Sequence, residues 1–243
     1  MTKKILFATI GLLVFSLAVT AFTNDGKSVS PKKGINTDSL NTTLIIVPFM
    51  DVYDSLHLDN FNLGKEAYQF ALQGFQKLVM LGKVKNPDLL TIVDFSQPST
   101  KKRMYIIDLK RKVLLEHSLV AHGRKTGELM ARSFSNTLES NQSSLGFYIT
   151  SDTYQGKHGL SLRLDGMEKN INDNARERAI VIHGADYATE GFCKSTGYLG
   201  RSHGCPAVPA NNSKTIINTL GNGSCLFIYS PDQKYLKRSA LLS

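Results

Sequence analysis

Short apolar runs separated by Gly, Asn, Asp and Ser dominate the chain from about residue 89 onward. These runs are rich in β-branched, leucine or aromatic residues and have the length of β-strands. The strands expected from them are 90–95, 104–109, 113–121, 147–150, 160–164, 179–183 and 224–229. The polar stretch 108–112 looks like a hairpin connection. Several short strands at this spacing predict a mainly β fold, either a sandwich or a barrel.

Apolar residues recur at helical spacing in only two places. Around residues 60–82 they form one stripe that Gly82 ends, and we expect this helix to pack against the β-rich region without chemistry of its own. The stripe consists of Tyr68, Leu72, Phe75 and Val79. A short later helix is expected at 212–220, where the apolar residues again share one face and Gly221 follows.

The beginning of the chain differs from the rest. A basic start containing Lys3 and Lys4 precedes an uncharged apolar stretch at 5–19, and small residues follow at 19–21. This order is typical of a secretory signal peptide and predicts a secreted or periplasmic protein. An uncleaved membrane anchor is the alternative, because no charge appears before Asp25. Residues 22–43 are rich in Ser, Thr, Asn, Lys and Gly, which is typical of a flexible tether.

The chain is basic, with 29 Lys and Arg against 20 Asp and Glu and a net charge of +9 in 243 residues. A composition that is 42% hydrophobic and 20% charged is ordinary for a globular protein. The excess of positive charge suits solubility, and it is compatible with an acidic polymer or with transient proximity to a membrane surface. The basic stretches 101–103 and 110–112 are short and accompany no nucleic-acid motif, so we expect no nucleic-acid partner. We expect a monomer.

Candidate chemistry gathers in two short stretches. His183 ends an apolar run, and Cys205 follows a short loop later within Ser202-His203-Gly204-Cys205. A thiol is a strong nucleophile only as the thiolate, and a neighbouring imidazole can accept its proton. His183 and Cys205 are therefore the expected base and nucleophile.

The residues around this pair suggest supporting roles. Gly204 lets backbone N–H groups approach a reacting carbonyl oxygen, and the backbone of His203 is expected to contribute to the same oxyanion site. Ser202 could orient the imidazole of His183 through its second nitrogen, and the carbonyl of Gly184 could do the same.

These residues resemble the murein L,D-transpeptidase catalytic-domain proteins of bacterial envelopes, which carry a histidine, a spacer and Ser/Thr-x-Gly-Cys. The run from Gly200 to Ala207 resembles one branch of that family. The similarity covers about Val52 to Val208 and includes the stretches Leu90–Ser96, Leu119–Gly123, Ser143–Tyr148 and Tyr154–Gly159.

The resemblance implies a β-rich L,D-transpeptidase-like sandwich or barrel. Cys205 would take an acyl group from a peptidoglycan tetrapeptide stem with release of D-Ala, and an acceptor amine would receive it, without any cofactor. We expect these domains: a signal peptide (1–21), a flexible tether (22–43), a helical N-terminal segment packed on the catalytic domain (44–88), the L,D-transpeptidase-like catalytic domain (89–232) and a C-terminal tail (233–243).

Two departures from the family pattern affect the substrate side. The loop between His183 and Ser202 is slightly longer than usual. Many relatives have an arginine shortly after the cysteine, whereas Pro206 and Ala207 stand there in this chain. Arg201 is the candidate replacement for binding substrate. Tyr154 and His158 lie in a loop flexible enough to line a groove, and they are further substrate-binding candidates.

Other functions remain open at this stage. With water as acceptor, the same site would be an L,D-carboxypeptidase or endopeptidase, and attack at an existing linkage would release wall-bound lipoproteins. A non-catalytic peptidoglycan-binding module is an alternative of another class. A zinc site is a further chemical alternative, because His183, Cys193, His203 and Cys205 are legitimate ligands, but no close ligand pair supports it and we expect no metal.

The three cysteines allow several states in an exported protein. Cys193 and Cys225 could form a disulfide that leaves Cys205 free, all three could be thiols, or Cys193 could bridge Cys205. Of the remaining histidines, His122 is expected to be a hydrogen-bonded turn residue. His57 and His117 are expected at the surface or at a sheet edge.

Overall fold

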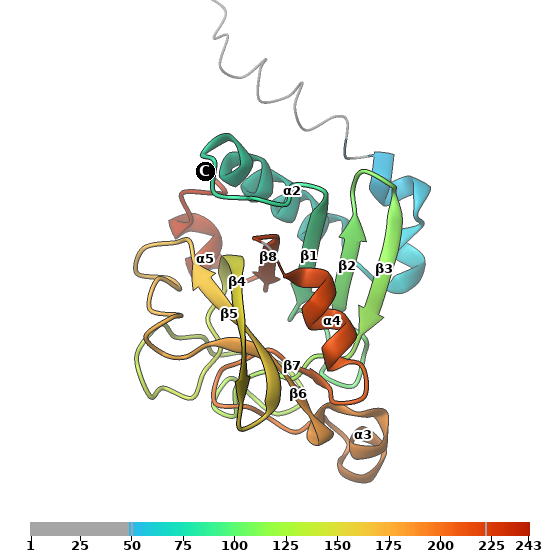
Figure 1. Ribbon diagram of the computed structural model, residues 1–243, viewed down its shortest axis with the longest axis vertical. Coiled ribbons are helices and arrows are strands. Elements are labelled where there is room, and N and C mark those ends of the chain that lie inside the picture. The colour runs from blue at the N-terminus through green and yellow to red at the C-terminus, as the bar shows by residue number, and fades with distance from the viewer. Residues whose placement is uncertain (1–48, 50, 222) are drawn as a thin grey trace, which may run out of the picture. The chain divides into compact units, whose positions relative to one another are not determined.

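Eight strands form one sheet in the computed structural model, which describes residues 49, 51–221 and 223–243 (Figure 1). The strands are β1 (Leu89–Asp94), β2 (Met104–Asp108), β3 (Val113–Ser118), β4 (Gly146–Gly156), β5 (Gly159–Gly166), β6 (Val181–Ala185), β7 (Ala207–Pro209) and β8 (Cys225–Tyr229). Their order across the sheet is β3-β2-β1-β8-β4-β5-β6-β7. Most neighbours are antiparallel, and the β1–β8 and β6–β7 pairs are parallel. The mainly β fold is confirmed.

The two outer strands of this sheet are joined by the segment that follows β3. Ala121 forms an antiparallel bridge with Ala207 of β7, and Gly123 forms a parallel bridge with Ser202. The sheet therefore curves into a nearly closed barrel, which removes most of its exposed edge. The closing segment also holds the stretch that leads from Ser202 to Ala207.

Helix α2 (Lys65–Met80) covers β1 and β8. Its buried face consists of Ala67, Tyr68, Ala71, Leu72, Phe75 and Leu78. Gly74 permits the close approach, because a Cβ there would lie 2.0 Å from the ring of Phe147. Val79 was expected on this buried face, but its side chain is 38% exposed. The buried face of α2 therefore ends before Val79. Gly82 follows with φ 65°, in the left-handed region that favours glycine.

The other helices are short. Residues 51–55 are helical. Further along the chain are the 3₁₀ segments η1 (Leu58–Phe61) and η2 (Asp186–Ala188) and the helices α3 (Glu190–Thr196), α4 (Ser213–Leu220) and α5 (Gln233–Arg238). The predicted later helix is α4, which packs against β5 and β6. Helices α3 and α5 and the three-residue strand β7 were not predicted. Asp232 and Thr189 cap α5 and α3 by accepting the N–H of Tyr235 and Phe192.

Residues 233–243, expected as a C-terminal tail, contain α5 and fold back onto the molecule. Tyr235 of α5 is only 6% exposed, and its hydroxyl donates to the buried carboxylate of Glu168 at 3.2 Å. Gln73 of α2 donates to the carbonyl of Leu242 at 3.0 Å, so the chain end lies beside α2 (Figure 1). Buried polar groups satisfied in this way anchor the segment.

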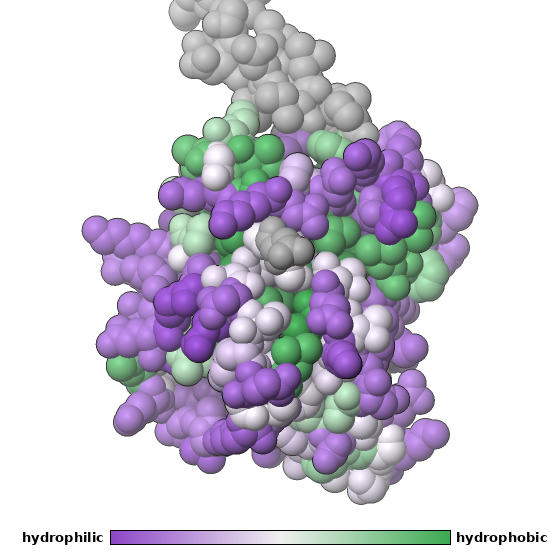
Figure 2. Space-filling view, in the orientation of Figure 1, coloured by the Kyte–Doolittle hydropathy of each residue, from purple (hydrophilic) through white to green (hydrophobic). Residues whose placement is uncertain are grey.

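The surface in Figure 2 is mostly hydrophilic, as the basic composition predicts. Exposed apolar side chains occur at the end of α2, at Val79, Met80 and Leu81. The predicted signal peptide (1–21) and tether (22–43) lie outside the described residues. Among the residues that the structure describes, no helix is both long enough and apolar enough to span a bilayer.

Candidate active site

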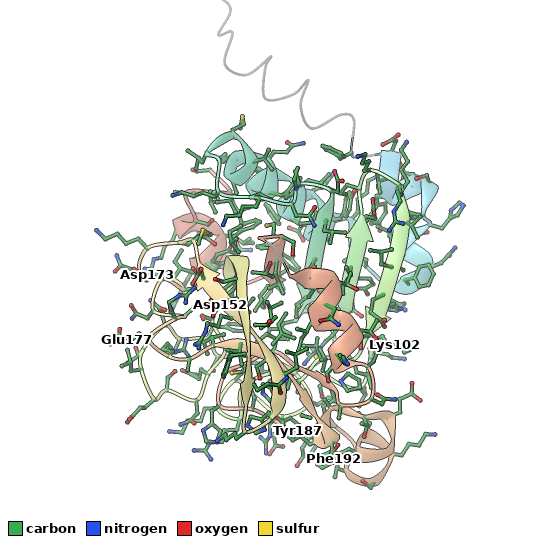
Figure 3. The ribbon with its side chains drawn as sticks, in the orientation of Figure 1. Lys102, Asp152, Asp173, Glu177, Tyr187 and Phe192 are labelled. Carbon is green, nitrogen blue, oxygen red and sulfur yellow. The ribbon has the colours of Figure 1, made fainter. Side chains whose placement is uncertain are left out.

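Most of the predicted site residues line one hollow of about 390 Å³. It brings together Tyr154, His158, His183, Arg201, Ser202, His203 and Cys205. Gly204 is buried directly before Cys205, and Gly184 lines a neighbouring hollow of about 690 Å³. Tyr187 lines both hollows, and Figure 3 labels it near the lower end of the β4–β5 hairpin.

Strand pairing brings the stretch that contains Cys205 close to β6. β6 and β7 are parallel, with His183 opposite Ala207. The N–H of Val181, two residues before His183, lies close enough to the Cys205 thiol to lower its pKa. Val181, His183 and Cys205 line one hollow. Residues 22 positions apart in the sequence thus meet in the same hollow.

The resting pair is uncharged at neutral pH. Burial raises the pKa of the Cys205 thiol, and the backbone N–H of Val181 and the positive Arg178 only partly oppose this. The thiol donates to the carbonyl of Ala179 at 3.6 Å. Burial lowers the pKa of His183, which is 4% exposed, and His158 and Lys157 lower it further. The site therefore holds a thiol and a neutral imidazole, and Cys205 would need a general base to react as a thiolate.

Gly184, and not Ser202, orients the imidazole. Nδ1 of His183 lies 2.9 Å from the carbonyl oxygen of Gly184, which can only accept, so Nδ1 carries the proton. Nε2 is then the basic nitrogen, as a general base requires. The suggestion that Ser202 orients His183 is wrong, because the hydroxyl of Ser202 donates to the carbonyl of Cys205 at 2.6 Å.

Ser202 instead fixes the turn that carries the nucleophile. Its oxygen also accepts the N–H of Gly204 at 3.0 Å, and Ser143 donates to the carbonyl of Gly204 at 3.1 Å. A trans peptide places its N–H opposite its carbonyl, so the N–H of Cys205 points away from Ser143. This N–H also lowers the pKa of the Cys205 thiol, so it lies near the sulfur. It is a backbone donor held close to the sulfur.

Gly204 adopts φ 128°, in a region that L side chains rarely enter. A Cβ at this position would lie 2.7 Å from the carbonyl oxygen of Gln142 and 3.1 Å from Nη2 of Arg178. The nucleophile turn therefore requires glycine for its conformation and for its space.

The tip of the β4–β5 hairpin covers the ring of His183. The rings of His158 and His183 stack with centroids 4.5 Å apart. Tyr154 precedes the tip, and the guanidinium of Arg163 lies 4.2 Å from the centroid of its ring. Tyr154 and His158 therefore lie at the wall of the hollow that contains Cys205.

Arg178 was missed by the sequence analysis. Its guanidinium donates to the carbonyls of Ser135 (2.8 Å) and Gln142 and to the hydroxyls of Ser144 (3.1 Å) and Ser140 (3.3 Å). It lies close enough to Cys205 to lower the pKa of the thiol. A cation near Cys205 thus comes from the turn before β6.

Arg201, the candidate replacement, also lines the hollow but is partly engaged elsewhere. Nη1 donates to the carbonyls of Arg124 (3.4 Å) and Gly127 (3.3 Å) and lies 3.6 Å from a carboxylate oxygen of Glu128.

The remaining histidines lie outside the hollow. His122 is buried and its Nδ1 accepts from Arg103 at 2.8 Å. His117 lies on the outer strand β3 and stacks on Tyr105, and His57 precedes η1.

All three cysteines are free thiols, so of the states left open the structure has three separate thiols. Cys225 is fully buried in β8, whereas Cys193 and Cys205 are partly exposed. Among the described residues, no group of three or more His, Cys, Asp or Glu side chains is arranged to hold a metal ion.

Comparison with known proteins adds a family. Residues 59–229 match the family described as the L,D-transpeptidase catalytic domain. A comparison with curated proteins finds no match.

Solved structures similar to this chain include an L,D-transpeptidase from Mycobacterium smegmatis, with 11% identity, a TM-score of 0.38 and coverage of 59% of either chain. An L,D-transpeptidase from Mycobacterium tuberculosis H37Rv has 12% identity and a TM-score of 0.38, with 59% of this chain and 58% of that one covered. The helical cell shape determining protein Pgp2 from Campylobacter jejuni has 14% identity and a TM-score of 0.38, covering 60% and 48%. The matched region thus spans about three fifths of the first of these chains.

Proposed function

The chain belongs to the family of L,D-transpeptidase catalytic domains, and from this premise we propose that it is a peptidoglycan L,D-transpeptidase with Cys205 as nucleophile. The observation that carries the proposal is the shared hollow of Cys205 and His183, in which Nδ1 of His183 is held by Gly184. This leaves Nε2 of His183 unprotonated and able to act as the base. The substrate is the tetrapeptide stem of peptidoglycan, and no cofactor takes part.

In the first step the thiol proton passes to Nε2 of His183 while sulfur attacks the carbonyl carbon before the terminal D-Ala. The oxyanion that forms is held by the backbone N–H of Cys205, which the Ser143 contact to Gly204 orients. The C–N bond then breaks, the imidazolium donates its proton to the departing amine, and D-Ala leaves. The product is a thioester on Cys205.

In the second step an amine of a neighbouring stem attacks the thioester. His183 accepts a proton from that amine and returns it to the departing sulfur, which restores the thiol and leaves a new amide cross-link. If water attacks instead, the product is a shortened stem, and the enzyme is an L,D-carboxypeptidase. The acceptor therefore decides between transfer and hydrolysis at one and the same site.

Such a reaction occurs at the cell wall, so we propose that the protein works outside the cytoplasm, exported by residues 1–21. Cell fractionation checks this: the protein is expected with the envelope or the medium, and deletion of residues 2–21 is expected to retain it inside the cell.

Intact-mass measurement of the purified protein with disaccharide tetrapeptide tests the activity. We expect an adduct on Cys205 whose mass equals the stem without D-Ala, together with dimeric product. Cys205→Ala is expected to form neither. A matched control is Cys193→Ser, which changes the other partly exposed thiol and should keep both. Full turnover by Cys205→Ala would overturn the proposal, and adduct with only tripeptide would change the assignment to a carboxypeptidase.

A further inference from the structure

The hollow of about 390 Å³ that contains Cys205 is called the Cys205 hollow below, and every charged side chain that lines it is positive. The described residues contribute Lys157, Arg178 and Arg201 to this lining, and no Asp or Glu is among them. The walls of such a hollow attract negative groups, because opposite charges in a partly enclosed site are poorly screened. The bound part of the substrate is therefore expected to be anionic.

Two of the three cations are already engaged. Arg178 uses both terminal nitrogens on the four acceptors of residues 135–144 described above. Arg201 contacts two carbonyls and Glu128. Lys157, in contrast, is exposed and forms no hydrogen bond or ion pair with any described residue. Asp186 lines the neighbouring hollow with Lys157, but the two form no ion pair. The ammonium of Lys157 is thus the cation available to a ligand.

Lys157 lies on the base side of the site. It precedes His158, whose ring stacks on His183, and its charge lowers the pKa of both His183 and Cys205. The base side is where the leaving group must lie, because His183 returns the proton to the departing amine. In a C-terminal residue, the α-carboxylate is two bonds from that amine.

We propose that Lys157 binds the free α-carboxylate of the departing C-terminal residue, and that the enzyme thereby selects stems that end at this residue. A stem whose last residue is amidated or continues further lacks this negative charge. The inference rests on the proposed function, since it concerns the same acylation step. It assigns a role in recognition to the hairpin tip, because Lys157 lies in the turn between β4 and β5 and precedes His158.

The test compares a tetrapeptide stem that ends in a free carboxylate with the same stem ending in a carboxamide. We expect the wild-type protein to form the Cys205 adduct from the acid with kcat/KM roughly five- to tenfold higher, the range of a partly exposed charge-assisted contact. Lys157→Met is expected to lose this preference, and Lys157→Arg to keep most of it. Lys214→Met removes an exposed lysine that lines only the neighbouring hollow, and it should keep the full preference.

Binding to the Cys205→Ala protein separates recognition from chemistry. The acid should bind more tightly than the carboxamide, and adding Lys157→Met should equalise the two dissociation constants. A preference that persists in Lys157→Met, or equal rates for both peptides in the wild type, would overturn the role of Lys157 and leave the transpeptidase intact. Absence of any adduct would overturn the proposed function, and the binding comparison would then decide the role of Lys157.

Discussion

The ring of His158 lies on the ring of His183, with centroids 4.5 Å apart and planes inclined by 23°. His158 lies at the tip of the β4–β5 hairpin. His183 lies in β6, which is the neighbour of β5 in the sheet. The stack therefore joins a loop to the proposed base. It shields one face of the imidazole from water, while Gly184 holds its Nδ1.

Replacing His158 by Ala should shift the pH dependence of acylation. Burial, followed by the charges of His158 and Lys157, holds the pKa of His183 below 6.5, so removing the ring and its charge raises that pKa. Less neutral base is then present at pH 6, and the acid limb of the rate profile moves to higher pH. An aromatic pair is worth about 0.5–1.5 kcal/mol, so the rate should also fall by up to about tenfold.

The measurement is the rate of Cys205 adduct formation between pH 5 and 8. His158→Phe keeps a ring without a charge and should retain most of the maximal rate. An unchanged acid limb in His158→Ala would contradict the role assigned to the stack.

Gly204→Ala should abolish most activity. The new Cβ would meet the Gln142 carbonyl at 2.7 Å, and φ 128° is strained for alanine. The turn must move, and the N–H of Cys205 moves with it. Loss of one oxyanion donor typically costs about 10²- to 10³-fold in rate.

Gly197→Ala is the matched control for this strain. Gly197 ends α3 with φ 83°, and a Cβ there meets nothing within 4 Å. It should lower the melting temperature slightly and leave adduct formation unchanged. If Gly204→Ala were no less active than Gly197→Ala, the turn would not position the oxyanion donor.

Arg178→Met should make the thiol of Cys205 harder to ionise. The positive charge of Arg178 lowers the pKa of this thiol, so its removal raises that pKa and slows alkylation by iodoacetamide at a fixed pH. Arg178→Lys keeps the charge but not the planar group that reaches four acceptors, and it should restore only part of the rate. Peptide mapping of alkylated Cys205 across pH 7–10 checks this, and identical profiles for the three proteins would refute it.

The sequence predicted the local parts of this molecule well. The strand runs are continuous in the chain, and His183 and Cys205 stand in a motif whose residues are close together. Strand β7 escaped prediction because it has three residues and includes Pro209, so its pairing with β6 defines it. Asp232 is the type of residue that commonly caps the N-terminus of a helix, and it could have indicated α5. The sequence after it contains few apolar residues and therefore resembles a tail.

Arg178 escaped for a different reason. It stands in a polar stretch that looks like a solvated loop, and its partners lie 34 to 43 residues earlier in the chain. Arg178 lies in a turn in which the next residue, Ala179, has φ 54°. Alanine rarely adopts this left-handed conformation, so the sequence does not indicate the turn. β6 accordingly begins at Val181 and not at residue 179. The contacts of Arg178 depend on tertiary structure, so no local sequence pattern predicts them.

Acid should destabilise the protein through His122, which links the core to the nucleophile turn. Arg103 donates to its Nδ1 at 2.8 Å, and the carbonyl of His122 accepts the N–H of Ser202 at 3.0 Å. Burial, followed by the charge of Arg103, lowers the pKa of His122 to about 4. A depressed pKa means that the unfolded chain binds the proton first, so stability is full above pH 6.5 and is lost as pH falls through about 4.

Urea unfolding at pH 7, 5.5 and 4.5 measures this loss. The shift limits the contribution of His122 to about 3 kcal/mol. His122→Gln keeps an acceptor for Arg103 without a titrating group, so its free energy of unfolding should fall less over this range. His117→Gln changes a histidine at the sheet edge and should follow the wild type more closely than His122→Gln does. Parallel pH dependences for the wild type and His122→Gln would show that the buried pair does not titrate on unfolding, and acid lability would then have to come from another group.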